Sequence, residues 1–259
     1  YMDEKHTTLA TIDEQSKAKA DLEFTDETGV THRLWIETDE EIIAKLVADF
    51  ADRKLYIADG HHRYETALNY RNYCRENGIS KPGDPQDFQM IYLVDMEHPG
   101  LVVFPTHRLV RDLPNFDKEA VLEKCSEFFY IDEKEGTDTV EEDLKKLYDE
   151  GKKAFGFYCG KGEWFLLTLK NIDIMSQMLP NVSKASQSLD VSVLHTLILE
   201  KIFGIDKENM AKQINLTYTK FFTEAIDGVD KGEFQCSFVL NPTRVTEIRD
   251  VAAAGEKMP

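Results

Sequence analysis

The chain has 259 residues, 42% of them hydrophobic, and a formal net charge of −17. This length suits one large domain or two ordinary ones, and the hydrophobic share is enough to form a buried core. No apolar run approaches the ~18 residues of a transmembrane helix, and the acidic balance argues against a broad surface for nucleic-acid phosphates. We therefore expect a globular protein that has neither a membrane nor a nucleic acid as its partner.

The cysteines indicate a cytoplasmic protein. Cys74, Cys125, Cys159 and Cys236 lie far apart in the sequence and form no CxxC pair. This spacing favours reduced and mostly buried thiols over disulfides. No charged-then-apolar leader opens the chain, so we expect no export signal.

The first half of the chain predicts a β-hairpin followed by helices and apolar strands. The hairpin is expected over 21–37, helices over 39–50 and 63–77, and strands over 54–58, 88–96 and 100–110. Asp39 is the expected N-cap of the first helix, and Gly78 is the expected stop of the second.

The second half of the chain predicts a less regular mixture of helices and strands. Helices are expected over 117–129, 139–150 and 190–204 and from Thr219 and Thr243, and strands over 153–159, 163–170, 214–218 and 234–240. Asp190 is expected to cap its helix and Gly204 to end it. Because strands and helices mix without strict alternation, we expect an α+β fold, or an α/β fold with mixed sheets. We expect one region over 1–259, with a weak subdomain boundary over 170–187.

A dense polar sequence, Asp59-Gly60-His61-His62-Arg63, stands where an apolar strand is expected to lead into a helix. The first N–H groups of a helix have no partner inside it and the helix dipole adds positive charge, so this arrangement is typical of an anion site. Gly60 permits close backbone approach, and Arg63 would bind a phosphate or carboxylate through two hydrogen bonds. His61 and His62 are candidate proton acceptors. Asp59 would cap the helix, orient a histidine or hold Mg²⁺.

A structural interpretation of the same residues stands beside this functional one. Asp59 would then be only an N-cap, Arg63 would pair with Glu65 or Asp59, and the two histidines would face water. The density of polar groups directly after an apolar stretch favours the functional interpretation.

Two further apolar runs lead into similar sequences, each of which would be an ordinary turn if taken alone. LVVF precedes Pro105-Thr106-His107-Arg108, and CSFVL precedes Asn241-Pro242-Thr243-Arg244. If the three strand ends share one edge of a sheet, they converge on one crevice, which is where open α/β sheets bind ligands. The candidate phosphate- and substrate-binding residues are Gly60, Arg63, Thr106, His107, Arg108, Asn241, Thr243 and Arg244.

His195 and Lys161 are interpreted as structural residues. His195 stands among apolar residues of an expected helix, which is typical of a core or interface histidine. Lys161, within Gly160-Lys161-Gly162, is expected at a hairpin tip, because the GxxxxGK[ST] pattern of a phosphate-binding loop is absent.

Four stretches together resemble a bacterial and archaeal family of unknown function, the one numbered ten-fifteen among such domains. The stretches are LYIADGHHRYETALNYR, FPTHRLV, LDVSVLHTLILEKIFGI and SFVLNPTRVTEIRDVAAAGEKMP. The resemblance covers nearly the whole chain and implies membership. It also implies that an N-terminal part and a C-terminal part of the family pattern are missing here, the second of which contains Lys, Ser and Tyr.

The stretch IADGHHRYETA is also similar to the signature of the ParB/sulfiredoxin-like superfamily. In that superfamily a strand leads through a Gly-x-x-Arg turn into a helix that holds nucleotide phosphates, and its members include partition CTPases, sulfiredoxin and free serine kinases. The similarity implies phosphate contacts at Gly60, His61, His62 and Arg63, with Asp59 beside them. Sulfiredoxin's catalytic cysteine and the partition proteins' DNA-binding helices have no counterpart here.

These features lead to one preferred function and two alternatives. The preferred function is a nucleotide- or phosphate-handling enzyme, most concretely a kinase of a small hydroxy compound such as an amino acid, with a nucleotide and Mg²⁺ as cofactors. Asp59 would hold the Mg²⁺, and His61 or His62 would take the hydroxyl proton. The first alternative is a metal-dependent hydrolase with Asp59, His61, His62 and His107 as ligands. The second is a non-catalytic, nucleotide-dependent switch or scaffold.

Overall fold

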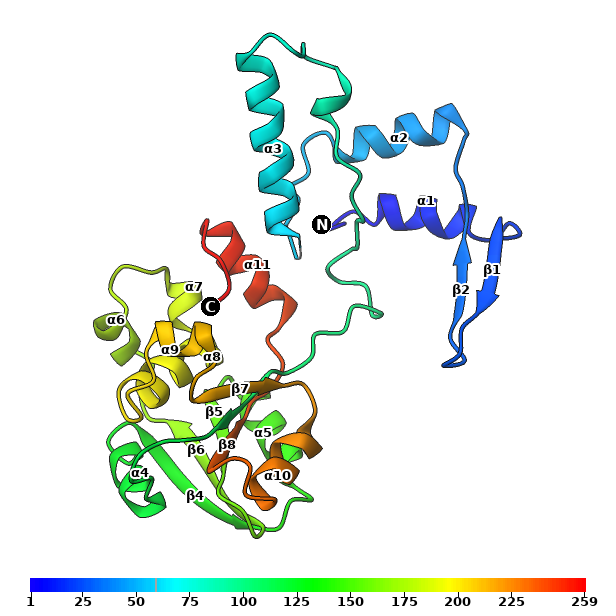
Figure 1. Cartoon of the computed structure of the whole chain (residues 1–259). Helices are drawn as coiled ribbons and strands as arrows, with labels where there is room; N and C mark the ends of the chain where they lie inside the picture. The colour runs from blue at the N-terminus through cyan, green and yellow to red at the C-terminus, as the bar shows by residue number, and fades with distance from the viewer. Residues whose placement is uncertain (59) are drawn as a thin grey trace. The chain divides into compact units, whose positions relative to one another are not determined.

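The structure is a computed structural model that describes residues 1–58 and 60–259. The chain divides into two compact units, Tyr1–Val102 and Val103–Pro259 (Figure 1). Residues 170–187, where the sequence suggests a weak boundary, lie inside the second unit. Helices and antiparallel sheets occur together without regular alternation, which confirms the α+β prediction.

The first unit contains a hairpin and a set of helices. Its elements are α1 (Thr7–Gln15), β1 (Leu22–Thr25), β2 (Thr31–Leu34), α2 (Glu40–Phe50), α3 (His61–Glu76) and the short 3₁₀ turn η1 (Pro85–Asp87). The predicted hairpin is confirmed, with Gly29 in the left-handed region at φ 84°. Asp39 caps α2 as predicted, because its side chain accepts hydrogen bonds from the N–H groups of Glu41 and Ile42.

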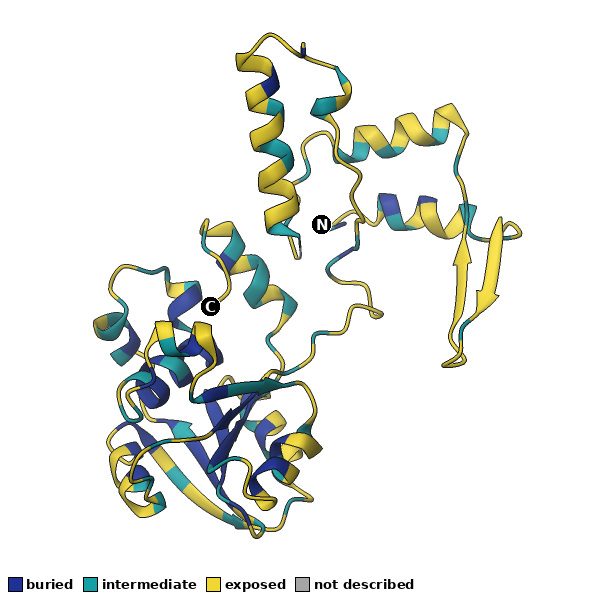
Figure 2. Ribbon diagram, in the orientation of Figure 1, coloured by how far each residue is buried: buried dark blue, intermediate teal, exposed yellow. Residues whose placement is uncertain are grey.

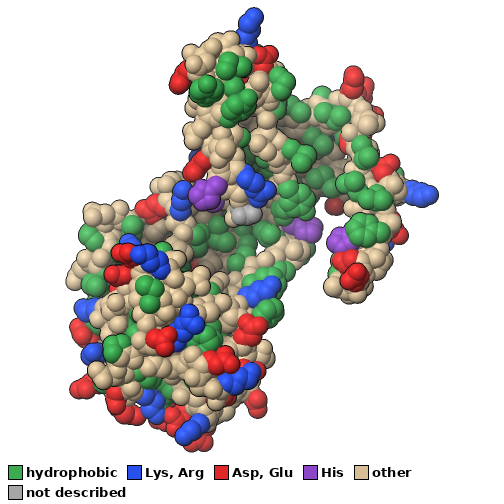
Figure 3. Space-filling view, in the orientation of Figure 1, with side chains coloured by type: hydrophobic (Ala, Val, Ile, Leu, Met, Phe, Trp, Pro, Cys, Tyr) green, Lys and Arg blue, Asp and Glu red, His purple; other side chains and the backbone are tan. Residues whose placement is uncertain are grey.

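The predicted strands at 54–58 and 88–96 are wrong, and the one predicted at 100–110 is formed only from His107 onward. A strand needs a partner for its backbone N–H and C=O groups, and an apolar pattern alone does not supply that partner. Val94 and Met96 bond to the backbone of Tyr1, whereas the backbone bonds of Phe88 and Asp95 are local turn bonds, to Pro85 and His98. Leu55 is accordingly 48% exposed and Tyr92 91% exposed. Figure 3 shows hydrophobic side chains on the surface of the first unit.

The second unit is built on one antiparallel sheet. Its strands are β3 (His107–Val110), β4 (Phe129–Glu135), β5 (Ala154–Tyr158), β6 (Glu163–Leu169), β7 (Leu216–Thr219) and β8 (Cys236–Val239), in the spatial order β4-β6-β5-β8-β3-β7. Its helices are α4 (Lys118–Cys125), α5 (Val140–Asp149), α6 (Ile174–Met178), α7 (Lys184–Gln187), α8 (Asp190–Val193), η2 (Leu194–Glu200), α9 (Lys207–Lys212), α10 (Phe222–Asp230) and α11 (Val245–Ala253). The β5–β6 hairpin confirms the predicted turn at Lys161.

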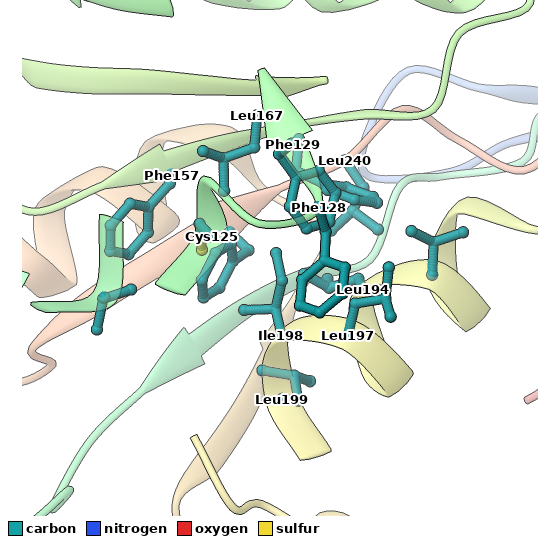
Figure 4. Close-up of a cluster of buried hydrophobic side chains, with 14 of the residues drawn as sticks. Cys125, Phe128, Phe129, Phe157, Leu167, Leu194, Leu197, Ile198, Leu199 and Leu240 are labelled. Atoms are coloured by element: carbon teal, nitrogen blue, oxygen red, sulfur yellow. The ribbon is translucent and has the colours of Figure 1, made fainter. Parts of the chain in front are cut away.

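Each face of this sheet carries its own hydrophobic core, and the central strands are almost wholly buried (Figure 2). On one face Phe157 and Leu167 pack with Leu197 of η2 and with α4 (Figure 4). On the other face Tyr158 and Trp164 pack against α5 and α10. Because side chains alternate along a strand, neighbouring residues enter different cores. The sheet therefore lies between two layers of helices.

The helix predicted over 190–204 changes its form along its length. It begins as α-helix in α8 and continues as the π-helical segment η2, followed by bonds such as Phe203 N–H to Ile198 C=O, five residues apart. The N-cap residue is Leu189, so the prediction that Asp190 caps this helix is wrong. The Asp190 carboxylate instead pairs with Lys153 at 3.0 Å.

The thiol prediction is confirmed for all four cysteines, which are free. Cys74, Cys125 and Cys236 are buried, and Cys159 is half-buried. Burial raises the pKa of the Cys125 and Cys159 thiols to about 12. Within the described residues, no helix combines the length and apolar character needed to cross a membrane.

Candidate functional site

Gly60 forms the turn that begins α3. It is the N-cap residue and lies in the left-handed region at φ 85°, and the first helical hydrogen bond runs from Tyr64 N–H to Gly60 C=O at 3.0 Å. The predicted glycine turn and helix start are therefore confirmed. A Cβ atom built on Gly60 would lie 3.1 Å from Nη2 of Arg63. The Arg63 guanidinium thus folds back over the glycine, a position that a side chain at residue 60 would obstruct.

An open hollow of about 440 Å³ adjoins this turn. His62, Arg63, Thr66 and Ala67 of α3 line it together with Gln89. Arg63 therefore faces a hollow, as predicted. Thr66 lies three residues after Arg63 on the same helix face, so helical spacing alone would have added it to the candidate site. Gln89 comes from a distant loop, and no sequence pattern indicates it.

Asp59 lies outside the described residues, so its predicted roles as cap, histidine partner and Mg²⁺ ligand stay predictions. Among the residues that the structure describes, no group of three or more His, Cys, Asp or Glu side chains is arranged to hold a metal ion. The hydrolase alternative drew on His107, which belongs to the second unit, and on His61 and His62 of the first.

The other two polar sequences meet at one edge of the second unit's sheet. β3 begins at His107 and β8 ends at Val239, and the two strands are antiparallel neighbours. The backbone N–H of Leu240 donates a hydrogen bond to Nδ1 of His107 at 3.3 Å. The two polar sequences are therefore brought together, but the prediction that Pro105–Arg108 follows a strand is wrong, because this sequence leads into β3. Thr106 precedes its strand and does not follow it, because the strand begins later than predicted.

His107 and Arg108 are adjacent in β3, so their side chains point to opposite faces of the sheet. The ring of His107 packs edge-on against Phe222 of α10, with ring centroids 6.3 Å apart. Nη2 of Arg108 lies 3.1 Å from Nε2 of His195 in η2, on the other face. The side chains of His107 and Arg108 therefore do not line the same pocket on one face of the sheet.

Arg108 is a buried cation with mainly neutral surroundings. It is 5% exposed, donates a hydrogen bond from Nη1 to the Thr106 carbonyl, and lies over the Tyr218 ring at 5.1 Å. Burial lowers the pKa of Arg108 to about 10, so it remains charged at neutral pH. Burial and the nearby guanidinium lower the pKa of His195 to about 3, so this histidine is neutral.

Asn241 and Arg244 both contact α5. The side-chain amide of Asn241 donates to the Leu144 carbonyl at 3.0 Å. Nη2 of Arg244 donates to the Tyr148 carbonyl at 3.1 Å and to Asp149 Oδ1 at 3.3 Å, and its guanidinium lies 4.2 Å from the centre of the Tyr148 ring. The Arg244 contacts cap the C-terminal end of α5, where the helix dipole favours a cation.

Thr243 is half-buried in the connection between β8 and α11, two residues before that helix begins. Arg63 belongs to the first unit, whereas Arg108 and Arg244 belong to the second. The expectation that all three arginines line one cavity stays a prediction.

A family model described as a protein of unknown function, DUF1015, matches residues 1–192. The chain belongs to the DUF1015 family. This confirms the family resemblance drawn from the sequence, whereas the similarity to the ParB/sulfiredoxin-like superfamily stays a prediction. No curated protein matches this DUF1015 chain.

Among solved structures, a conserved hypothetical protein from Pyrococcus furiosus is similar to the DUF1015 chain. The two share 18% sequence identity over 78% of this chain, with a TM-score of 0.37. The DUF1015 chain spans 66% of the length of that protein.

His195 of the DUF1015 chain contacts the candidate site residue Arg108, although the sequence pattern around it was interpreted as structural. Its apolar neighbours indicated a core histidine, and it is indeed buried on most sides. It lies 87 positions from Arg108 in sequence, and only the fold brings the two together. A histidine within a long apolar helix was the one available signal.

Proposed function

We propose that this DUF1015 protein is an enzyme that binds the phosphate groups of a nucleotide or phosphorylated metabolite and transfers a phosphoryl group to a small hydroxy compound. The observation that carries the proposal is the start of α3. Gly60 has a left-handed backbone and no side chain, and Arg63 folds back over it beside an open hollow.

Three features of this helix start favour a bound phosphate. The first N–H groups of an α-helix have no acceptor within the helix, and they point toward the N-cap, where the dipole is positive. Gly60 cannot cap them, because it has no side chain. Arg63 adds a cation in the first turn, beside the positive end of the helix dipole, and its planar guanidinium matches the oxygen atoms of a phosphate. A phosphate at this position would receive hydrogen bonds from both the backbone and the guanidinium.

Phosphoryl transfer needs mainly positioning and charge neutralisation, which these groups supply. In the proposed step the acceptor hydroxyl oxygen forms a bond to phosphorus while the bond to the leaving phosphate oxygen breaks. His62 lines the hollow and is the proposed base that takes the hydroxyl proton, with His61 as the neighbouring candidate. Asp59 remains the proposed Mg²⁺ ligand.

Calorimetric titration of the protein with nucleotides, with and without Mg²⁺, tests the binding step. We expect Arg63→Ala to weaken nucleotide binding by about 10- to 150-fold, the usual effect of losing a hydrogen bond to a charged group. Arg71→Ala is the matched control, because Arg71 lies two turns further along α3 and donates to Asn72. If Arg63→Ala lowers stability and leaves the affinity per folded molecule unchanged, the residue is structural and the proposal fails.

Product formation separates an enzyme from a switch. We expect His62→Ala to retain nucleotide affinity and to slow phosphoryl transfer to hydroxy acceptors in single-turnover reactions, typically by about 100-fold or more. Tight nucleotide binding without any product would favour the non-catalytic switch. Metal analysis of protein purified without an affinity tag tests the hydrolase alternative, which requires a bound metal.

A further inference from the structure

Arg108 differs from the other buried cations of the chain, because the described residues offer it no carboxylate. Arg53 pairs with Asp3 at 3.0 Å, and Lys153 pairs with both Asp190 and Glu247. Arg108 is more deeply buried than either, at 5% exposure, yet no ion pair joins it to a described acidic side chain. An unpaired charge is expensive to bury, so such a residue is retained where something else balances it.

The hydrogen bonds of Arg108 are also incomplete. A guanidinium has five N–H donors. One on Nη1 reaches the Thr106 carbonyl and one on Nη2 reaches His195, whereas the Nε–H is buried and has no acceptor among the described residues. A buried donor without an acceptor costs stability and indicates a missing acceptor. An oxygen atom of a ligand would accept a hydrogen bond from this Nε–H group.

His195 is held at this point by an unusual backbone. It is the second residue of η2, and π-helical segments are rare and are frequently found at functional sites. Because Arg108 always donates, Nε2 of His195 must accept, so a neutral His195 carries its proton on Nδ1. The histidine therefore orients the guanidinium without adding charge, and the pair carries a single positive charge.

We propose that Arg108 and His195 form a binding site for the carboxylate group of a small-molecule ligand. One negative charge balances the single positive charge of the pair, and the planar arginine fork matches the two oxygens of a carboxylate. The exposed residue nearest to this pair along β3 is Thr106, whose carbonyl contacts Arg108, so the proposed side of entry is the start of β3. This inference does not depend on the proposed phosphate site, because it uses only residues of the second unit.

The test is a titration of the protein with acetate at constant ionic strength, with chloride as the reference anion. Labelling the histidines with ¹⁵N allows the His195 ring signals to be followed, and His195→Gln assigns them. We expect acetate to shift the His195 signals and to raise the melting temperature. Arg108→Met should weaken acetate binding by about 10-fold or more. Arg111→Met is the matched control on an exposed arginine just beyond β3 and should leave acetate binding unchanged.

Three outcomes would overturn the proposal. Inorganic phosphate binding at His195 in place of acetate would show that the site takes a different anion. Equal acetate binding by wild type and Arg108→Met would show that Arg108 is not the ligand. No shift of the His195 signals with acetate would show that the charge of Arg108 is balanced within the chain. Where Arg108→Met does not fold, Arg108→Lys keeps the charge and removes the fork, and an unchanged affinity in that variant contradicts the proposal equally.

Discussion

Nε2 of His195 accepts a hydrogen bond from Nη2 of Arg108 at 3.1 Å, across the interface between the π-helical segment and the sheet. Burial, with the adjacent guanidinium, lowers the pKa of His195 to about 3. The same two causes lower the pKa of His107, on the opposite face of β3, to about 4. Both histidines are therefore neutral in the folded protein at every pH at which an unfolded histidine titrates.

This depression of the histidine pKa values predicts a loss of stability in mild acid. Between the folded pKa and the usual value of 6.5, the unfolded chain binds more protons than the folded one, so the free energy of unfolding falls as the pH falls. We expect the contribution of His195 to decline by about 1 kcal/mol for each pH unit below about 6. Urea unfolding at several pH values between 7 and 4 measures it.

His195→Gln is the control for this pH dependence, because glutamine cannot be protonated. The variant should show a shallower fall of unfolding free energy with pH than the wild type. A surface control is His32→Gln, because His32 is half-exposed and pairs with Asp26 on the first unit's hairpin. Identical pH profiles for wild type and His195→Gln would contradict a buried neutral His195.

The left-handed turn at residue 60 allows stability to be separated from ligand binding. Gly60→Ala places a Cβ atom in a strained backbone region and against the Arg63 guanidinium, whereas Gly78→Ala, at φ 69°, meets no atom within 4 Å. Each should lower the free energy of unfolding by about 1–2 kcal/mol, the usual cost of a left-handed non-glycine residue. Only Gly60→Ala should also weaken nucleotide binding, because only it displaces Arg63. Equal nucleotide affinities in the two variants would show that Arg63 does not bind the nucleotide.

The sequence predicts local elements well where the signal is contained within one short segment. Asp39 and the hairpin at Gly29 are correct because a cap and a turn depend on a few neighbouring residues. The apolar run at 88–96 fails because strand formation depends on a partner far away in the sequence. In the candidate site, Gly60 and Arg63 are predictable for the same reason as the cap and the turn, because both belong to one short local segment.

Long-range contacts explain what the sequence could not indicate. His195 meets Arg108 only because η2 packs on one face of β3, and Gln89 approaches α3 from a separate loop. The π-helical form of η2 is also hidden, because its apolar spacing differs little from that of an α-helix. Arg244 shows the reverse case, since a local motif suggested a ligand contact and the fold directs the side chain to α5.

The contacts of Arg244 predict a structural effect. Arg244→Ala removes hydrogen bonds to the Tyr148 carbonyl and to Asp149 at the end of α5, together with the stacking on the Tyr148 ring. We expect the free energy of unfolding to fall by about 1 kcal/mol, because the guanidinium is partly exposed. Nucleotide and acetate affinities should stay unchanged in calorimetric titrations. A loss of either affinity without a loss of stability would show that Arg244 binds a ligand.

Asp190 is another buried group whose ionisation affects folding. Although Lys153 lies 3.0 Å away, burial raises the pKa of Asp190 to about 6. Because this folded value lies above the ordinary one near 3.8, the folded protein binds more protons between the two, and the stability contributed by Asp190 is lost as the pH rises through this range. Asp190→Asn should therefore raise the free energy of unfolding at pH 8, by on the order of 1–3 kcal/mol, and change it little near pH 4.

Lys153 retains Glu247 at 3.3 Å in the Asp190→Asn variant, so removing the aspartate charge does not leave the lysine unpaired. Glu247 also accepts a hydrogen bond from the Tyr148 hydroxyl at 2.6 Å, which fixes its position beside the lysine. Glu247→Gln is the comparison. Burial raises the pKa of Glu247, but the Tyr148 hydrogen bond and Lys153 more than offset this, so the pKa is lowered and the charge of Glu247 is stabilising. That variant should lose stability at pH 8. Equal losses at pH 8 for Asp190→Asn and Glu247→Gln would mean that the attraction of Lys153 outweighs the burial of Asp190.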